Sequence, residues 1–475
     1  MEKFFKLKAH NTDVKTEIIA GITTFMSMAY ILAVNPSILG ASGMPSGAVF
    51  TATAIASAVA TILMGLIANL PFALSAGMGL NAYFAFTVCN PQAIGASWQF
   101  ALAAVFAEGI IFILLSLTNV REAIFNSIPM SLKTGVSAGI GLFILIIALI
   151  NAKILIPNPD TAVSLVPFAQ ARNGVFDLLD MQVVSSILCL IGVVIIGVLI
   201  EKKVKGNILI GILIVWILGM ICQLLGIYKP GSVVDGVYVV GNTDGANAFY
   251  SLIPSGIVSA PASMSPTLFA FTKGFAEIET KGIVQFIVVL ISFLFVDIFD
   301  TLGTLIGCAS SGNMLDKNGK LPGIKGALLA DAIGTTFGAM VGTSTITTFV
   351  ESASGVEEGG RTGLTAITVA VLFLLALFFW PIFSVIPSFA TSSALIVVGF
   401  LMMKNVTKIE WNDVTEALPA FLAIIAMPFF YSISEGISFG IISYVLINIF
   451  TGKAKKVNPV LVVVAILFIF KYAFV

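Results

Sequence analysis

Long apolar segments recur along almost the whole chain, and they limit its fold more than any other feature. We count about fourteen runs of about 17 to 25 residues between Glu17 and Phe450, each able to cross a hydrocarbon core of about 30 Å. Of the 475 residues, 58% are hydrophobic and only 10% are charged, a balance that soluble globular domains do not have. The sequence therefore predicts an all-α polytopic membrane protein with about fourteen transmembrane segments.

The basic residues predict how these segments are oriented, because cytoplasmic loops of membrane proteins carry an excess of Lys and Arg. If the N-terminus is cytoplasmic, 18 of the 24 basic residues fall on the cytoplasmic side, including clusters at Lys202–Lys205 and Lys453–Lys456. We therefore expect a multi-pass protein of the cell (inner) membrane with a cytoplasmic N-terminus. The sequence leaves open whether the apolar tail 458–475 is a further span.

The N-terminal segment and the cysteines exclude other interpretations. Residues 1–16 are charged and are not followed by a cleavage site, so the first apolar run is not a cleaved signal peptide. The four cysteines are scattered through apolar segments without CxxC spacing, which indicates neither a disulfide framework nor a zinc site. We expect no metal and no cofactor.

Five carboxylates lie inside these apolar runs: Glu108, Asp297, Asp300, Asp331 and Glu351. Apart from Lys325 near the cytoplasmic end of the segment that holds Asp331, no Lys, Arg or His lies in these runs to neutralise them. A charged side chain at mid-bilayer costs about 2.5 to 3.5 kcal/mol on insertion scales, so such acids usually face a cavity and handle a proton, an ion or a polar substrate. A role in helix packing through hydrogen bonds is the alternative, and it stays open for Glu108 in particular.

Short matches between the two halves indicate an internal repeat. Ala52–Ser57 matches Ala330–Thr335 at an offset of 278, and Leu74–Gly77 matches Ser352–Gly355 at the same offset. A weaker match, Ile128-Pro129 with Ile386-Pro387, follows in the same order. Because each copy would hold seven spans, the second copy must enter the membrane from the opposite side, which predicts a 7+7 inverted repeat with its site near the midplane.

The third and tenth segments are short and break the helical pattern. The run Ser75–Gly79 resists helix formation, and Thr343–Val350 is rich in β-branched residues until helix becomes favourable at Glu351. We therefore expect short β-strands before half-helices in segments 3 and 10. The two strands could pair with each other, and both half-helix N-termini would then point at one central site.

Segment eight brings acids together by spacing alone. Asp297 and Asp300 are three residues apart and Thr304 is four further on, which predicts that all three share one helical face. Two acids so close would hold one proton between them, as a proton-coupled carrier requires. Sodium coordination by the same oxygens is the alternative that the sequence leaves open.

Two side chains at the half-helices suit a planar polar ligand. Glu351 opens the half-helix of segment ten, where its carboxylate could accept a pair of N–H donors. Asn81 can donate and accept through its amide, and Phe84 and Phe349 could stack on a ring. Asp331 matches Thr53 in the repeat, which suggests a coupling or structural position.

Several long segments resemble one transporter family. They are GITTFMSMAYILAVNPSIL, SAGMGLNAYFAF, FVDIFDTLGTLIG and LADAIGTTFGAMVGTSTITTFVESASGVEEGGRTGLTA. The chain is similar, from about Ile18 to Phe450, to the purine permeases of the AzgA-like branch of the xanthine/uracil permease and nucleobase-ascorbate transporter superfamily. The resemblance implies a permease rather than an enzyme, with proton-coupled uptake of adenine, guanine or hypoxanthine.

The resemblance also implies roles for individual residues. Asp300 falls where the superfamily has its segment-eight substrate-binding acid, and Glu351 falls on the segment-ten residue that binds the base. Asp331 and Asn81 match the segment-nine Asp and the segment-three Asn of this branch. We therefore expect substrate binding and proton coupling by two overlapping sets of residues. The binding set is Asn81, Asp300, Glu351, Phe349, Ser352 and Thr24, and the coupling set is Asp297, Asp300, Asp331 and Glu351.

Three positions depart from the xanthine and uracil branches. Thr24 stands where many members have a His, Thr304 where they have Asp or His, and Ser352 where xanthine carriers have Asn. These changes argue against xanthine, uric acid or uracil as the main substrate.

The resemblance further implies a core domain of segments 1–4 and 8–11, a gate domain made of the rest, and a homodimer through the gate domain. The expected ranges are 1–16 for a cytoplasmic segment, 17–117 and 283–381 for the core, 118–227 and 382–452 for the gate, 228–282 for an extracytoplasmic loop, and 453–475 for a basic loop with an apolar tail.

Two other classes of protein are weighed against this interpretation. An anion carrier or exchanger of the same fold would need a basic residue at the segment-ten half-helix, where Glu351 stands. A membrane-embedded enzyme would need a metal cluster or a nucleophile with a base, and no His lies in the apolar segments. We expect a purine nucleobase, protons and the lipid bilayer as partners, and no nucleic acid.

Overall fold

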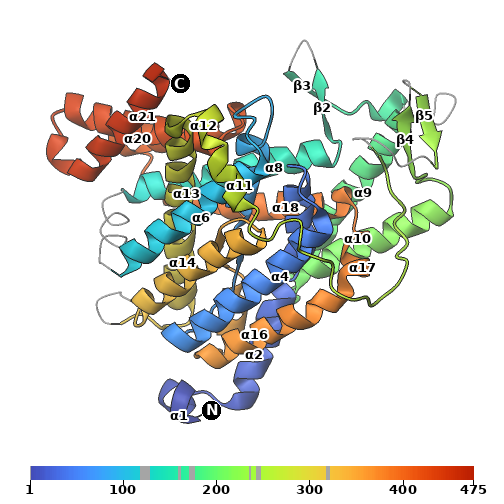
Figure 1. The fold of residues 1–475 in the computed structure, drawn as a ribbon, viewed down its shortest axis with the longest axis horizontal. Helices are drawn as coiled ribbons and strands as arrows, with labels where there is room; N and C mark the ends of the chain where they lie inside the picture. The colour runs from blue at the N-terminus through green and yellow to red at the C-terminus, as the bar shows by residue number, and fades with distance from the viewer. Residues whose placement is uncertain are drawn as a thin grey trace.

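Long apolar helices make up most of the molecule (Figure 1). The computed structural model describes residues 2–117, 129–158, 162–170, 177–234, 237–241, 248–316 and 321–474. Within these ranges, ten helical stretches are long and apolar enough to cross a membrane. They are Val14–Gly40, Ser46–Ala68, Trp98–Ser116, Met130–Asn151, Leu178–Glu201, Asn207–Leu224, Ile283–Ala309, Ile324–Val341, Gly363–Phe383 and Ser388–Lys408.

Three shorter apolar helical stretches lie at further predicted spans: Met78–Val88, Val414–Phe429 and Glu435–Phe450. The chain is therefore a mostly helical, multi-pass membrane protein, as its hydropathy predicts. Residue 118, where the gate domain is predicted to begin, and Ile128 of the weakest repeat match lie outside the described residues.

The first span is two helices rather than one. Helix α2 (Val14–Met28) begins at Asp13, whose carboxylate accepts from the backbone N–H groups of Lys15 and Thr16 at 2.8 and 3.0 Å. A turn at Ala29 and Tyr30 separates it from α3 (Ile31–Gly40). Pro36 lies within α3, and since proline has no N–H, the regular hydrogen bond to the preceding turn is missing there.

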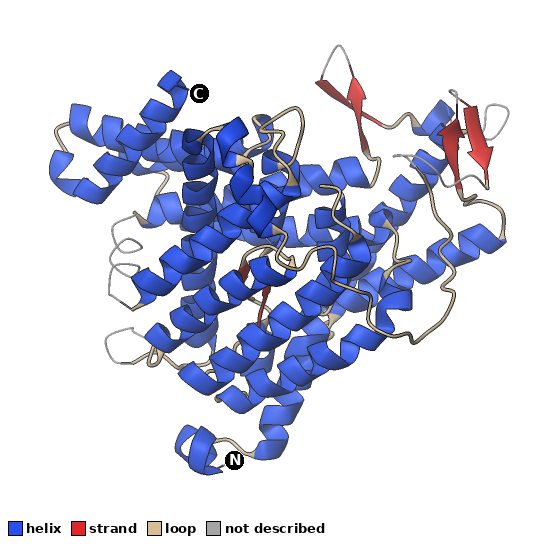
Figure 2. Ribbon diagram, viewed as in Figure 1, coloured by secondary structure: helices blue, strands red, loops and turns tan. Residues whose placement is uncertain are grey.

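Two short strands cross in the middle of the bundle, where Figure 2 draws them in red among the helices. Strand β1 (Leu74–Ala76) pairs antiparallel with β6 (Ile346–Thr348), with Ser75 opposite Thr347. Helix α5 (Met78–Tyr83) follows β1, and α15 (Ser352–Glu357) follows β6. The prediction that segments 3 and 10 are strands that precede half-helices and pair with each other is confirmed.

Each strand is also held by a threonine of the preceding long helix. Thr61 of α4 (Ser46–Leu63) binds both the C=O and the N–H of Leu74, at 3.2 and 3.0 Å. Thr335 of α14 (Ile324–Val341) binds the same two groups of Ile346, at 3.0 and 3.2 Å. The same contact therefore occurs twice, at the first residue of each strand.

This repeated contact corrects the register of the sequence matches. Thr61 and Thr335 are 274 positions apart, whereas the sequence matches used an offset of 278. The difference is four residues, about one helical turn. Because similar apolar residues recur at that spacing in a helix, two alignments that differ by one turn match almost equally well. When the halves are matched by this contact, Asp331 pairs with Ser57, one helical turn away from the pairing with Thr53 that the sequence matches give.

The second match is also wrong as a structural correspondence. Residues Leu74–Ala76 form a strand, whereas Ser352–Gly355 lie in helix α15. The strands themselves lie 272 positions apart, because Leu74 and Ile346 are their first residues.

Most helix-to-helix contacts fall within two groups of helices. The first group contains α2, α3, α4, α5, α14 and α15, together with α6 (Trp98–Ser116), α13 (Ile283–Ser311) and α16 (Gly363–Ala376). The second group contains α8 (Met130–Asn151), α9 (Leu178–Glu201), α10 (Asn207–Leu224), α18 (Ser388–Met403), α19 (Val414–Phe429) and α20 (Ile433–Phe450). An ion pair between Lys205 of the second group and Glu358 of the first joins them at a loop.

Two β-hairpins lie between the long helices, and the second of them lies in the predicted extracytoplasmic loop 228–282. They are β2 (Leu155–Asn158) with β3 (Ala162–Leu165), and β4 (Gly231–Val234) with β5 (Val237–Val240). The short helices α11 (Phe271–Ala276) and α12 (Ile278–Lys281) follow in the same loop. The valine-rich runs that form β4 and β5 favour strands, a signal that the loop prediction did not use.

The C-terminal tail forms α21 (Pro459–Phe474), which packs against α20 (Figure 1). At 1.5 Å per residue a helix of 16 residues spans about 24 Å, less than the hydrocarbon core. The tail therefore lies against α20, a helix of the second group.

Glycine allows α6 and α14 to approach closely. A Cβ atom on Gly109 would lie 2.4 Å from Oγ1 and 2.7 Å from the backbone N of Thr336, both too short for a normal contact. Gly197 in α9 is a contrasting helical glycine, since nothing lies within 4 Å of an added Cβ.

We expect Gly109→Ala to lower stability by about 1 to 3 kcal/mol, because the added methyl group forces two packed helices apart. Gly197→Ala is the matched control and should leave stability unchanged or slightly raised, since alanine favours helix. Thermal unfolding of the detergent-purified full chain would compare the two. Equal melting temperatures for both variants would contradict the close packing at Gly109.

Candidate functional site

The five intramembrane acids all belong to the first group of helices, and the crossing strands lie among them. Glu108, Asp297 and Asp331 are completely buried, whereas Asp300 and Glu351 are partly exposed. Asp297 and Asp331 both contact the hydroxyl of Thr301. Glu108 and Asp300 contact the hydroxyls of Thr345 and Thr347, and Glu351 follows these two threonines in the chain. The acids therefore form one neighbourhood although they come from four different elements.

Asp300 lies on an open face of α13. Its Oδ2 accepts from Oγ1 of Thr347 in β6 at 3.1 Å. Gly303 and Gly307 follow at helical spacing, both are exposed, and a Cβ on either would meet no atom within 4 Å. This part of α13 is therefore accessible beside a carboxylate in the middle of a membrane-spanning helix.

Glu351 occupies the N-cap position of α15, as its sequence position predicts. The hydroxyl of Tyr30, a residue that the sequence analysis did not select, donates to Oε1 of Glu351 at 2.5 Å. Val350 beside it is 62% exposed even though it lies within a broken membrane segment. Glu351 therefore combines a donor from the first span with partial exposure.

Asp297 contacts Thr301, four residues further along α13, and through this threonine it is linked to Asp331. Oγ1 of Thr301 lies 2.8 Å from Oδ1 of Asp297 and 2.8 Å from Oδ1 of Asp331. Asp300 instead faces Thr347, so these contacts do not join Asp297 to Asp300. A hydroxyl carries one hydrogen, so Thr301 cannot donate to both acids, and one of the two bonds requires a proton on a carboxyl group.

Asn81 faces the strand crossing but does not begin its helix. Its Oδ1 accepts from the hydroxyl of Ser344, and its Nδ2 donates weakly to the C=O of Ala76 at 3.4 Å. Helix α5 begins at Met78, earlier than predicted, because the backbone N–H of Asn81 already bonds to the C=O of Gly77 at 2.8 Å.

The remaining predicted binding residues are buried beside α15 or in it. Ser352 accepts from the N–H of Ala73 at 3.0 Å through its Oγ, which holds the chain before β1. Phe349 is 5% exposed, and its N–H donates to the C=O of Ala73 at 2.9 Å. Thr24 packs against Gly355, and its buried hydroxyl has no hydrogen-bond partner among the described residues.

Glu108 makes a contact that its position in α6 did not indicate. Its Oε2 accepts from Oγ1 of Thr345 at 2.8 Å, and the C=O of Thr345 accepts from the N–H of Gly77 at 3.0 Å. Glu108 is thus linked to the strand crossing itself. Thr301 could have been found from its spacing four residues after Asp297, whereas nothing in the sequence singles out Thr345, Thr347 or Tyr30.

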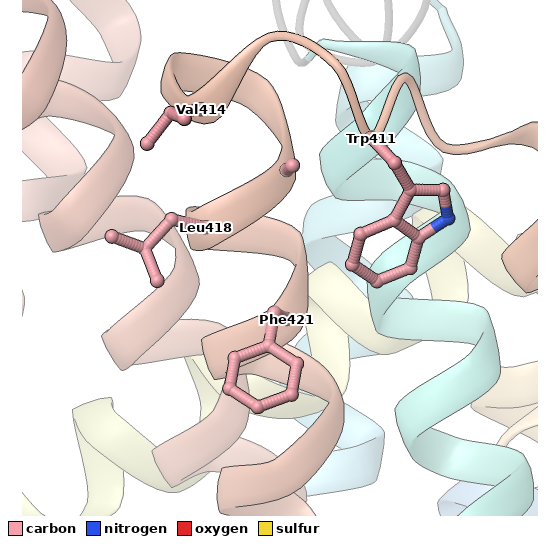
Figure 3. Close-up of a pocket in the computed structure, with 5 residues that line it drawn as sticks. Trp411, Val414, Leu418 and Phe421 are labelled. Atoms are coloured by element: carbon pink, nitrogen blue, oxygen red, sulfur yellow. The ribbon is translucent and has the colours of Figure 1, made fainter.

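A hollow on the outer side of α19 does not suit a polar ligand. It measures about 250 Å³ and is lined by Trp411, Val414, Ala417, Leu418 and Phe421 (Figure 3). All five side chains are apolar, and α19 belongs to the second helix group, so this hollow is separate from the acids. The candidate site is therefore the neighbourhood of Asp300 and Glu351.

The Permease family model, Xan_ur_permease, matches residues 15–439. The chain belongs to this xanthine/uracil permease family. Its sequence is 43% identical to the putative permease MJ0326 of Methanocaldococcus jannaschii, over 100% of this chain and 98% of that protein. It is 42% identical to the guanine/hypoxanthine permease PbuO of Bacillus subtilis, over 98% of each, and 39% identical to the adenine permease AdeP of Escherichia coli, over 100% and 96%.

These relatives confirm the family that the sequence motifs predict, and they make the chain a permease rather than an enzyme. The fold is similar to that of the transmembrane domain of a cyanobacterium bicarbonate transporter, BicA, with a TM-score of 0.59 over 89% of this chain and 97% of that one. The identity between the two is 15%, so this likeness concerns the fold alone.

We expect Thr301→Val to lower stability by about 1 to 3 kcal/mol, because at least one buried carboxyl group loses its hydrogen-bond partner. The matched control is Thr391→Val in α18, whose hydroxyl bonds only to the C=O of Ser388 in its own helix, at 3.1 Å. Thermal unfolding in detergent would measure both. If Thr301→Val melted no lower than the control, the bridge between Asp297 and Asp331 would be contradicted.

Proposed function

We propose that this permease is a secondary active transporter that imports purine nucleobases, namely guanine, hypoxanthine or adenine, by proton symport. The observation that carries the proposal is the pair of partly exposed carboxylates, Asp300 and Glu351, beside the crossing strands of a permease fold. The names of PbuO and AdeP, relatives that cover nearly the whole chain, support purines as the substrate class.

The chemistry of the purine edge suits these two acids. Guanine offers adjacent N–H donors on its ring and its exocyclic amine, and a carboxylate can accept both. Hypoxanthine keeps the ring N–H, whereas adenine presents a donor beside an acceptor and so needs a donor in return. In this proposal Asp300 and Glu351 bind the base, with Asn81, Phe349, Ser352 and Thr24 around it.

The proton has a place in the same neighbourhood. The bridge from Asp297 through Thr301 to Asp331 needs one carboxyl proton. A second proton can bind to Asp300 or Glu351, the two acids that the substrate contacts in this proposal. We assign coupling to Asp297, Asp300, Asp331 and Glu351. Sodium coupling is the alternative, since the oxygens of the bridge are also of the type that binds a hard cation.

Alternating access follows from the two groups of helices. We propose that the first group is the core domain, 17–117 and 283–381, and that the second is the gate domain, 118–227 and 382–452. The repeated threonine contacts at Leu74 and Ile346 support fourteen segments in a 7+7 inverted repeat, and such folds rock one domain against the other around a midplane site. A cytoplasmic N-terminus, the inner membrane and a homodimer through the gate domain belong to the same proposal.

An anion carrier is the second candidate, because BicA, named a bicarbonate transporter, has a similar fold. Anions favour basic residues and free N–H donors, however, and here two carboxylates border the strand crossing. We therefore place the anion carrier second to the purine symporter.

The substrate is tested by uptake of radiolabelled guanine, hypoxanthine, adenine, xanthine, uracil and bicarbonate into liposomes that hold the purified chain. We expect saturable uptake of purines. We expect Glu351→Gln to reduce this uptake at least tenfold, because the carboxylate has two acceptor oxygens whereas the glutamine amide has one acceptor oxygen and one donor NH2 group. Glu357→Gln is the matched control, since Glu357 is an exposed acid at the end of the same helix. Uptake of bicarbonate without purines would refute the purine assignment and favour the anion carrier.

The coupling ion is tested in the same liposomes by imposing one gradient at a time. An inward proton gradient without sodium should drive purine accumulation, and a protonophore should abolish it. Accumulation that follows only a sodium gradient would contradict proton symport while leaving the purine assignment intact.

A further inference from the structure

We infer that Tyr30 is a positioning residue for substrate binding: its hydroxyl holds the Glu351 carboxylate in one orientation, so that Oε2 meets the purine edge. The inference rests on the proposed function, because it assumes that Glu351 binds the base. Tyr30 itself does not need to touch the substrate.

The contact between the two side chains is short, and its donor is completely buried. The hydroxyl of Tyr30 lies 2.5 Å from Oε1 of Glu351, and Tyr30 has no exposed surface. Hydrogen bonds from a hydroxyl to a carboxylate are typically about 2.5 to 2.7 Å long and are about twice as strong as neutral ones. Because Tyr30 is completely buried, water cannot compete for its hydroxyl, and this strengthens the bond further.

The position of Tyr30 in the first span keeps its hydroxyl in place. Tyr30 lies in the turn between α2 and α3, where its C=O accepts from the N–H groups of Ala33 and Val34 at 3.0 and 2.9 Å. Glu351 is followed directly by α15, so the bond joins the break in segment one to the break in segment ten.

Helix α2 is aligned along α15 by two further contacts. Oγ of Ser354 donates to Oγ of Ser27 at 3.1 Å, and Gly355 lies so close to Thr24 that an added Cβ would be 2.1 Å from its Oγ1. Thr24, Ser27 and Tyr30 follow one another at intervals of three residues, which places them along one side of the first span. The tyrosine is thus part of a packed contact and not a side chain with free rotation.

A fixed carboxylate binds a planar ligand better than a mobile one. The terminal torsion of a glutamate is broad, so an unrestrained carboxylate samples many planes and loses that freedom when a base binds. With Oε1 held by Tyr30, the plane is set before the ligand arrives, and Oε2 is the oxygen that no side chain among the described residues occupies. Preorganisation of this kind increases affinity by lowering the entropy lost on binding.

The test compares guanine affinity of the purified full chain in detergent for wild type, Tyr30→Phe, Glu351→Gln and the double variant. We expect Tyr30→Phe to raise the Kd for guanine about two- to tenfold, the range for ordering one flexible side chain on binding, because the bond from Tyr30 to Glu351 is present before guanine arrives. In the Glu351→Gln background the same change should have little further effect, because the residue acts through Glu351. A purely space-filling role predicts no change, since phenylalanine keeps the ring.

Tyr228→Phe serves as the control, because Tyr228 is also buried and donates a single bond, to the C=O of Tyr250 at 3.0 Å, far from Glu351 in the sequence. If Glu351→Gln leaves no measurable binding, the cycle is read on the melting temperatures of the ligand-free proteins, where the two changes should be non-additive. An unchanged Kd in Tyr30→Phe would overturn the inference alone. A wild type that binds no purine at all would overturn the proposed function instead.

Discussion

The antiparallel pairing of β1 with β6 is the interaction on which the rest of the structure depends. Extended backbone in the middle of an apolar bundle is tolerated only where its N–H and C=O groups find partners. The two strands supply these partners to each other, and the bonds from Gly77 to Thr345 and from Phe349 to Ala73 extend the ladder beyond both ends. Thr61 and Thr335 satisfy the first residue of each strand.

The same pairing organises the polar side chains around it. Three hydroxyls in and before β6 reach three different helices: Ser344 bonds to Asn81 in α5, Thr345 to Glu108 in α6, and Thr347 to Asp300 in α13. Because this segment is extended and not helical, the side chains of successive residues point in different directions and can contact different helices. One irregular segment therefore binds polar side chains from three helices at once, among them the two acids Glu108 and Asp300.

Much of this architecture could be predicted from the sequence. The apolar runs predicted most of the long helices, because hydropathy over about 20 residues is a local property. The β-branched run before Glu351 predicted the tenth-segment strand and the helix start, since both depend on neighbouring residues. The register of the repeat was not recoverable from short matches, because a shift of one turn aligns one apolar helix almost as well as another.

The sequence by itself determined the membrane class, the two breaks and the identity of the acids, because hydropathy, strand propensity and charge are carried by the residues in place. Only the tertiary structure decided which groups meet. It joins Asp297 to Asp331 through Thr301, and it brings Tyr30 to Glu351 across 321 positions. Helical spacing reports neighbours within one helix, whereas the contacts of Thr301 with Asp331 and of Tyr30 with Glu351 depend on how separate helices pack.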